Sequence, residues 1–180
     1  MESNFNFKNF SIVIPIFNEE EILEESTNAI FSLCKRMEID FEIIFSENGS
    51  TDKTKAIAEE LTNKHPEIKI ISNPEPNYGN ALKTGFKIAK NDLVISFDID
   101  YYSESFLSEA LKLESEYSGI TASKRLGSSE DGRRFIRRLA TNFFVILLKT
   151  LFGTKLSDTH GMKAIKTVSY THLRAHETEY

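Results

Sequence analysis

Residues 93–100 read Leu-Val-Ile-Ser-Phe-Asp-Ile-Asp, an uncharged run that ends in two carboxylates, Asp98 and Asp100. Such a run is typical of a strand buried on both faces, as in a parallel sheet covered by helices. Ligands of open α/β sheets collect at the carboxyl ends of the strands, where these two residues stand. Because alternate side chains of an extended segment point the same way, Asp98 and Asp100 are predicted to hold one Mg²⁺ or Mn²⁺ ion beside a nucleoside diphosphate. The plain alternative is that two acidic residues merely begin a solvated loop.

The rest of the chain alternates between segments typical of strands and of helices. Strands are expected at residues 10–16, 41–45, 68–71, 93–98 and 119–123, with helices between them and a last long helix at 133–152. Four successive β-α units predict an α/β fold with a mostly parallel central sheet and right-handed crossovers.

Two further loops are expected at the same edge of the sheet as Asp98. Pro15 to Glu19 follow the first strand, and Ser46 to Asp52 follow the second. The carboxylates of Glu19 and Glu47 could accept hydrogen bonds from a nucleobase, and a glycine turn would let the backbone approach the ligand. The alternative for these loops is helix capping, since Asn18 and Ser50 are ordinary N-cap residues.

Composition and length indicate one globular domain. The 180 residues are 40% hydrophobic and 27% charged, and the single Cys34 leaves no cysteine cluster for zinc or for an internal disulfide. The chain opens without a secretory signal, and it contains no apolar run of the roughly 18 to 20 residues that span a bilayer. The expected location is therefore cytoplasmic.

Charge is distributed unevenly along the chain. Residues 1–123 hold 11 Lys and Arg against 22 Asp and Glu, whereas residues 124–155 hold 8 basic residues against 2 acidic ones. A local basic cluster before an apolar run suits an anionic partner at a membrane surface, so peripheral membrane association is expected. Nucleic acid is disfavoured because the acidic remainder would repel its phosphates. The apolar stripe of the helix at 133–152 is also what a core-facing helix would show.

The last residues, 168–180, look like a translated sequencing adapter. We expect them to lie outside the evolved domain, which would then comprise residues 1–167 and be truncated at its C-terminus. The helical spacing of His172 and His176 consequently carries no functional weight.

Four motifs, taken in order, resemble one enzyme family. They are Ser11-Ile-Val-Ile-Pro-Ile-Phe-Asn-Glu19, Glu47-Asn-Gly-Ser-Thr-Asp52, Asn77-Tyr-Gly79 with Gly85 downstream, and Phe97-Asp-Ile-Asp100. Their order and spacing resemble the family-2 glycosyltransferases, especially the dolichyl-phosphate and polyprenyl-phosphate hexosyltransferases. The resemblance implies a GT-A fold, a Rossmann-like three-layer sandwich.

The resemblance also implies roles for individual residues. Pro15, Asn18, Glu19, Glu47 and Gly79 would line the nucleotide of a donor such as GDP-mannose or UDP-glucose. The metal on the diphosphate would be held by Asp98 and Asp100. Later acceptor-side motifs of this family resemble Ser123-Lys-Arg125, the arginine-rich segment and Leu156 to Lys163, and by that resemblance Arg125, Arg133 and Arg137 would meet the acceptor phosphate.

Three positions depart from the family pattern. Glu47-Asn48 stands where relatives commonly carry Asp-Asp, which leaves the base preference open. Tyr102 stands where a metal-assisting Gln is frequent, and His160 occupies an acceptor-side position where Gln is commoner.

Several function classes fit these residues. The favoured one is an inverting, metal-dependent hexose transfer from a nucleotide sugar to a polyprenyl phosphate. A family-2 transferase with a saccharide acceptor, a haloacid-dehalogenase-like phosphatase, which also places D-x-D after an apolar strand, and a nucleotide-binding module without turnover are the alternatives.

Overall fold

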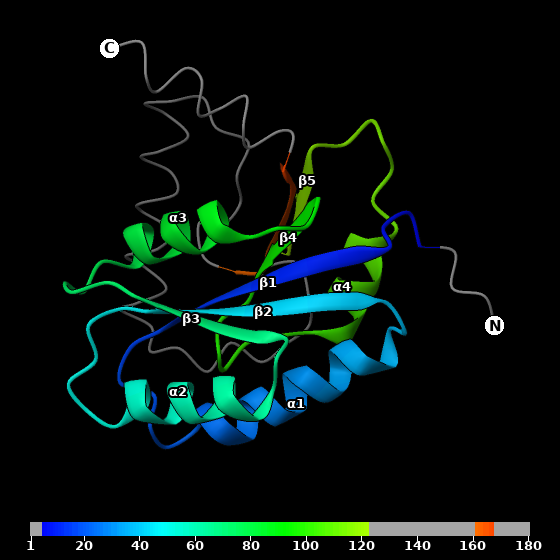
Figure 1. Ribbon diagram of the computed structural model, residues 1–180. Helices are drawn as coiled ribbons and strands as arrows, with labels where there is room; N and C mark the ends of the chain where they lie inside the picture. Colours follow the sequence, from blue (N-terminus) through cyan, green and yellow to red (C-terminus); the bar gives the residue numbers. More distant parts are fainter. Residues whose placement is uncertain (1–4, 123–160, 168–180) are drawn as a thin grey trace, which may run out of the picture. The chain divides into compact units, whose positions relative to one another are not determined.

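The computed structural model describes residues 5–122 and 161–167, in which strands and helices alternate as predicted (Figure 1). The strands are β1 (Asn9–Ile16), β2 (Asp40–Glu47), β3 (Ile68–Ser72), β4 (Leu93–Ser96), β5 (Gly119–Thr121) and β6 (Lys163–Lys166). The helices are α1 (Leu23–Arg36), α2 (Thr54–Lys64), α3 (Tyr78–Ile88) and α4 (Glu104–Leu111). The helix predicted at 133–152 lies outside the described residues.

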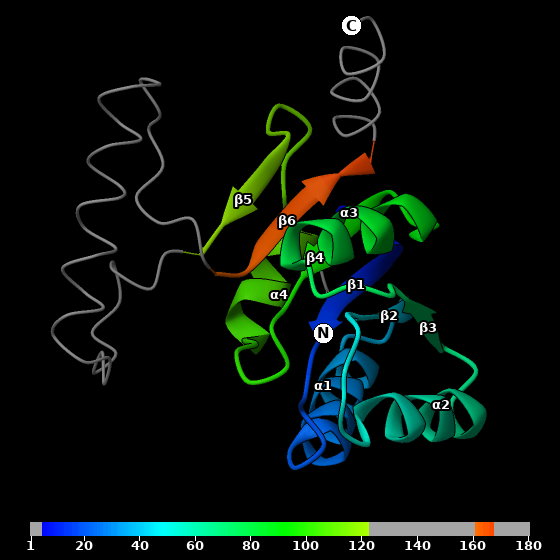
Figure 2. The same cartoon turned by 90° about the vertical axis from the view of Figure 1, so that its left-hand side faces the viewer.

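One sheet contains all of these strands, in the order β3-β2-β1-β4-β6-β5. Strands β3, β2, β1 and β4 are parallel, which confirms the mostly parallel sheet. Strand β6 was not predicted, and it pairs antiparallel with both β4 and β5 (Figure 2). This pairing joins segments far apart in the sequence, and β6 has too few residues to show a clear alternation of its own.

Helices cover both faces of the sheet, as the three-layer prediction required. Helix α3 lies on one face, and α1 and α2 lie on the other (Figures 1 and 2). The face below α3 buries Val13, Ile44 and Val94, against which Leu82 and Phe86 of the α3 segment pack.

The opposite face is built from the alternate positions of the same strands. Ile12 of β1 lies between Ile43 of β2 and Ile95 of β4 in the sheet register, and all three side chains are fully buried. Phe31 of α1 contacts Phe41 of β2 edge to face, with 5.4 Å between the ring centroids. Burial on both faces explains why these strands read as continuous apolar runs.

Helix α3 is tied to the sheet by polar side chains of β2. Near its beginning, Ser46 Oγ donates a 2.7 Å hydrogen bond to the Ala81 carbonyl. Just beyond its end, Glu42 Oε1 accepts from the Lys90 amide at 2.7 Å. Burial alone would raise the pKa of Glu42, but hydrogen bonds from Lys69, the Lys90 amide and Ser11 outweigh it and lower the pKa. Glu42 is therefore an ionised anchor at neutral pH.

Between these two anchors, α3 approaches β1 so closely that only glycine fits at position 85. A Cβ atom added to Gly85 would lie 2.3 Å from Cγ1 of Val13, well inside van der Waals contact. The β-branched Val13 side chain is stiff and fully buried, so it has little room to move away.

We predict that Gly85→Ala destabilises the chain by about 1–3 kcal/mol, the usual cost of overpacking, even though alanine improves helix propensity by up to about 1 kcal/mol. Denaturant unfolding measures the effect. Gly79→Ala is the matched control, because a Cβ there would meet Asn77 Oδ1 at an ordinary 3.5 Å. Contact with Val13 does not restrict position 85 if Gly85→Ala is as stable as the wild type, or if its cost is unchanged when Val13→Ala makes room.

Candidate active site

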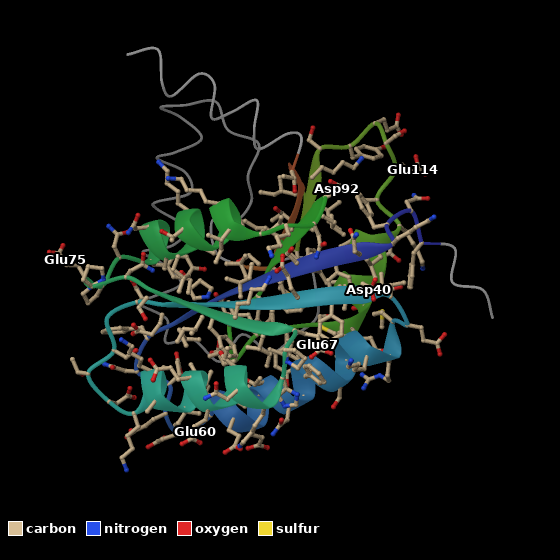
Figure 3. The ribbon with its side chains drawn as sticks, in the orientation of Figure 1. Asp40, Glu60, Glu67, Glu75, Asp92 and Glu114 are labelled. Carbon is tan, nitrogen blue, oxygen red and sulfur yellow. The ribbon has the colours of Figure 1, made fainter. Side chains whose placement is uncertain are left out.

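A cavity of about 250 Å³ lies at the carboxyl ends of the parallel strands. Its lining residues come from the end of β1 and the loop that follows it, the loop after β2, the first residue of α3 and the turn after β4: Pro15, Ile16, Phe17, Glu19, Asn48, Tyr78, Asp98, Ile99 and Asp100. The amino ends of the strands form the opposite edge, where Asp40 and Asp92 lie in Figure 3, with Glu75 at the carboxyl edge. The structure thus brings together Pro15, Glu19, Asp98 and Asp100 of the predicted site.

Asp98 and Asp100 lie in a tight turn rather than in an extended strand. Strand β4 ends at Ser96, and Asp98 and Tyr101 then exchange backbone hydrogen bonds of 3.3 and 3.0 Å. The prediction that Asp98 and Asp100 point the same way because they alternate along an extended strand is therefore wrong. Both residues nevertheless line the same cavity.

Glu19 adds a third carboxylate to the cavity. Its pKa is raised, first by burial and then by the neighbouring charges of Asp100, Asp52 and Asp98. Such mutual repulsion favours a cation in the cavity. Among the described residues, no group of three or more His, Cys, Asp or Glu side chains is arranged so that it could hold a metal ion.

Tyr78, the first residue of α3, was missed by the sequence analysis. Its hydroxyl donates a 3.1 Å hydrogen bond to Oδ1 of Asp98. Partial burial and the Asp98 carboxylate raise the pKa of Tyr78 well above its usual value, so the hydroxyl remains protonated at neutral pH. The Asn77-Tyr-Gly79 motif indicated this region, but Gly79 was the residue predicted to line the nucleotide. Gly79 itself lies exposed beside Tyr78 and is not among the residues that line the cavity.

At the end of β2, the residue that lines the cavity is Asn48, not Glu47. Glu47 is only 2% exposed, and its Oε1 accepts a 2.6 Å hydrogen bond from the Ser50 amide. The side chain of Asn48 accepts from the Asn77 amide at 2.7 Å and so connects this loop to the start of α3. In this arrangement Glu47 holds its own loop in shape.

Asn18 joins the loops that follow β1 and β2. Its Oδ1 accepts from the Thr51 amide at 2.8 Å, and its own amide donates to Ser50 Oγ at 3.2 Å. The next residue continues the link, because the Glu19 amide donates to Thr54 Oγ1 at 2.7 Å. The capping alternative is wrong for Asn18, since α1 begins only at Leu23. Asn18 also has a left-handed backbone, with φ of 55°.

The predicted acceptor residues Arg125, Arg133 and Arg137 lie outside the described residues, as does His160. The boundary at residue 167 likewise stays a prediction.

We predict that Asn18→Ala lowers the free energy of unfolding by about 1–3 kcal/mol, because it removes the Thr51 contact and places alanine in a left-handed conformation. Asn18→Gly should cost less, since glycine adopts that backbone freely and only the side-chain contact is lost. Thermal or denaturant unfolding of the two variants separates these effects. Equal stability of Asn18→Ala and the wild type would show that the loops are not held together by Asn18.

Comparison with known sequences places the chain in a family. The model of glycosyl transferase family 2 matches residues 11–173, most of the chain. The protein therefore belongs to glycosyl transferase family 2, as the four motifs indicated. Membership excludes the haloacid-dehalogenase-like alternative, whose D-x-D motif serves a different chemistry.

Among curated relatives, the chain is similar to enzymes named undecaprenyl-phosphate 4-deoxy-4-formamido-L-arabinose transferase. The protein from Proteus mirabilis is 37% identical over 150 residues, which cover 82% of this chain and 45% of the relative. The protein from Pseudomonas fluorescens is 30% identical over 152 residues, which cover 82% of this chain and 44% of the relative. The chain thus spans less than half the length of these relatives.

Solved structures confirm the GT-A fold. A mannosyltransferase from Pyrobaculum calidifontis, in complex with GDP-Man and Mn²⁺, aligns with a TM-score of 0.64 at 18% identity and covers 95% of this chain and 48% of its own. Glucosyl-3-phosphoglycerate synthase from Mycobacterium tuberculosis, with Mn²⁺, UDP and phosphoglyceric acid, aligns with a TM-score of 0.65 at 22% identity, covering 89% and 56%. At these identities the likeness shows the fold alone.

No helix within residues 5–122 and 161–167 combines the length and the apolar character needed to cross a bilayer.

Proposed function

We propose that this chain forms the donor-binding part of an inverting, metal-dependent glycosyltransferase whose acceptor is a polyprenyl phosphate. The observation that carries the proposal is the cavity at the carboxyl edge, where Asp98, Asp100 and Glu19 lie together in a member of glycosyl transferase family 2. An acidic cavity would repel a diphosphate unless a cation accompanied it.

The residues present fit Mg²⁺ or Mn²⁺. Both ions prefer hard oxygen ligands, and the carboxylates of Asp98 and Asp100 face a cavity with room for a ligand. Bound there, the cation would supply positive charge that stabilises the diphosphate as it leaves the anomeric carbon. Burial is the first cause of the raised pKa of Glu19, and the charges of Asp100, Asp52 and Asp98 raise it further, so a cation in the cavity would relieve part of this repulsion.

The donor nucleotide is proposed to occupy the remainder of the cavity. Pro15 and Glu19 line it directly, whereas Asn18, Glu47 and Gly79 lie in the adjoining segments and shape its walls. Asn48, at the end of β2, offers an amide to the same space. These assignments make the β1 and β2 loops responsible for base recognition.

The proposed acceptor explains why a strong general base is not required. A phosphate monoester is largely ionised near neutral pH, with a second pKa of about 6, so its oxygen can attack the sugar directly. Attack from the face opposite the diphosphate inverts the anomeric centre. Arginines that position the phosphate are then useful, and Arg125, Arg133 and Arg137 are proposed for this task. A lipid acceptor would also place the protein at the cytoplasmic membrane surface.

The motifs and the relatives point to different sugars. The motif resemblance favours a hexose carried by GDP or UDP, whereas the relatives from Proteus and Pseudomonas are named for 4-deoxy-4-formamido-L-arabinose. A binding comparison of GDP-mannose, UDP-glucose and a nucleoside diphosphate carrying the formamido sugar would decide between them.

We predict that Asp98→Asn and Asp100→Asn each weaken binding of Mn²⁺ in the presence of GDP or UDP by more than about 10-fold. Loss of a neighbour that only orients a metal ligand already costs about 10–100-fold, so loss of a ligand should cost at least as much. Isothermal titration calorimetry measures this affinity directly.

Asp92→Asn is the matched control for this experiment. Asp92 is exposed, precedes β4 and lies at the opposite edge of the sheet (Figure 3), so the variant removes the same charge away from the cavity. Equal losses in Asp92→Asn and Asp98→Asn would assign the effect to net charge. Unchanged Mn²⁺ affinity in Asp98→Asn and Asp100→Asn would show that these residues do not hold the metal.

The acceptor assignment predicts that Arg133→Gln/Arg137→Gln weakens binding of a short-chain isoprenyl phosphate by about 10-fold or more, because a hydrogen bond to a charged group contributes roughly 1.5–3 kcal/mol. Affinity for GDP or UDP should stay unchanged. Bidentate contacts should also resist salt above about 0.15 M, where surface attraction fades. Wild-type binding by the double variant at every salt concentration would favour a saccharide acceptor instead.

A further inference from the structure

Tyr78 stands at the end of a chain of polar contacts that begins at the β2 loop. The side chain of Asn48 accepts from the Asn77 amide at 2.7 Å, and Asn77 Oδ1 caps α3 by accepting from the Asn80 amide at 2.9 Å. Tyr78 follows immediately as the first helical residue. Its backbone is consequently held on both sides before its side chain reaches the cavity.

The Tyr78 hydroxyl contacts the Asp98 side chain, and hydrogen bonds to Tyr101 already hold the Asp98 backbone. The two backbone hydrogen bonds between Asp98 and Tyr101 close the turn, but they leave rotation of the Asp98 side chain free. The 3.1 Å hydrogen bond from Tyr78 to Oδ1 restricts that rotation. One carboxylate oxygen is occupied by a neutral donor, and the other is left for a cation.

The neighbourhood of the turn makes this orientation more important. Tyr102, which stands where a metal-assisting Gln is frequent in the family, directs its ring toward Phe97, with 6.5 Å between the centroids. Tyr102 is also not among the residues that line the cavity, so the orientation of the Asp98 and Asp100 carboxylates matters correspondingly.

We propose that Tyr78 is a positioning residue that orients the Asp98 carboxylate for the divalent metal. This inference rests on the proposed function, because it assigns Tyr78 a role in the same site. Tyr78 is 45% exposed and lines the cavity together with Asp98, so its hydroxyl can act without supporting the buried core. It is an orienting partner of the kind that tunes a metal ligand through a hydrogen bond.

The test is Tyr78→Phe, which removes the hydroxyl and keeps the ring. Calorimetric titration of Mn²⁺ at saturating UDP or GDP should show an affinity about 10-fold or more below wild type. Melting temperature and affinity for the nucleotide without metal should remain at wild-type values. Tyr117→Phe is the matched control, because Tyr117 is 55% exposed and is not among the residues lining the cavity.

The possible results separate this inference from the proposed function. If the wild type binds Mn²⁺, Asp98→Asn loses it and Tyr78→Phe binds normally or more tightly, Tyr78 does not position the ligand, while the metal assignment stands. If Tyr78→Phe weakens nucleotide binding without metal and leaves Mn²⁺ affinity unchanged, Tyr78 contacts the nucleotide directly and the inference is wrong. If the wild type binds no Mn²⁺ even with UDP or GDP present, the proposed function and this inference are both refuted.

Discussion

Parallel pairing of β1 with β2 on one side and β4 on the other is the constraint on which the site depends. The register joins Ile16 to Glu47 and Val13 to Ser96, so the three strands end at one edge of the sheet. Each following loop must therefore begin at that edge, and the cavity is formed from these loops. Hydrophobic burial on both faces of the sheet stabilises the pairing. The face under α3 buries Val13, Ile44 and Val94, and the opposite face buries Ile12, Ile43 and Ile95.

The packing of α3 against the sheet sets the position of the Tyr78 side chain. Gly85 allows the helix to lie against Val13, while Ser46 and Glu42 anchor its two ends. Tyr78 at the start of the helix then reaches Asp98. Gly85 thus contributes to the geometry of the site, because a larger side chain at this position would displace α3 and move Tyr78 with it.

Electrostatics divides the cavity between groups of different roles. Asp98, Asp100 and Glu19 concentrate negative charge in the cavity, and burial together with the neighbouring carboxylates raises the pKa of Glu19, whereas Tyr78 contributes a neutral donor. The side chains of Asn18 and Glu47 instead accept hydrogen bonds from backbone amides of the loop after β2. The side chains that hold the loops together therefore differ from the carboxylates that charge the cavity. Variants of the first group should change the stability of the chain, and variants of the second should change its affinity for a cation.

The sequence by itself determined the order of the β-α units, the parallel core of the sheet and the edge that carries Asp98 and Asp100, because burial on two faces leaves a continuous apolar run and parallel strands end together. Tertiary structure decided what local patterns could not express. Strand β6 depends on pairing with distant β4 and β5, and Asn18 resembles a helix cap although its partner, Thr51, belongs to another loop. The Tyr78 contact with Asp98 likewise exists only because α3 packs across β1, which brings residues remote in sequence within hydrogen-bonding distance.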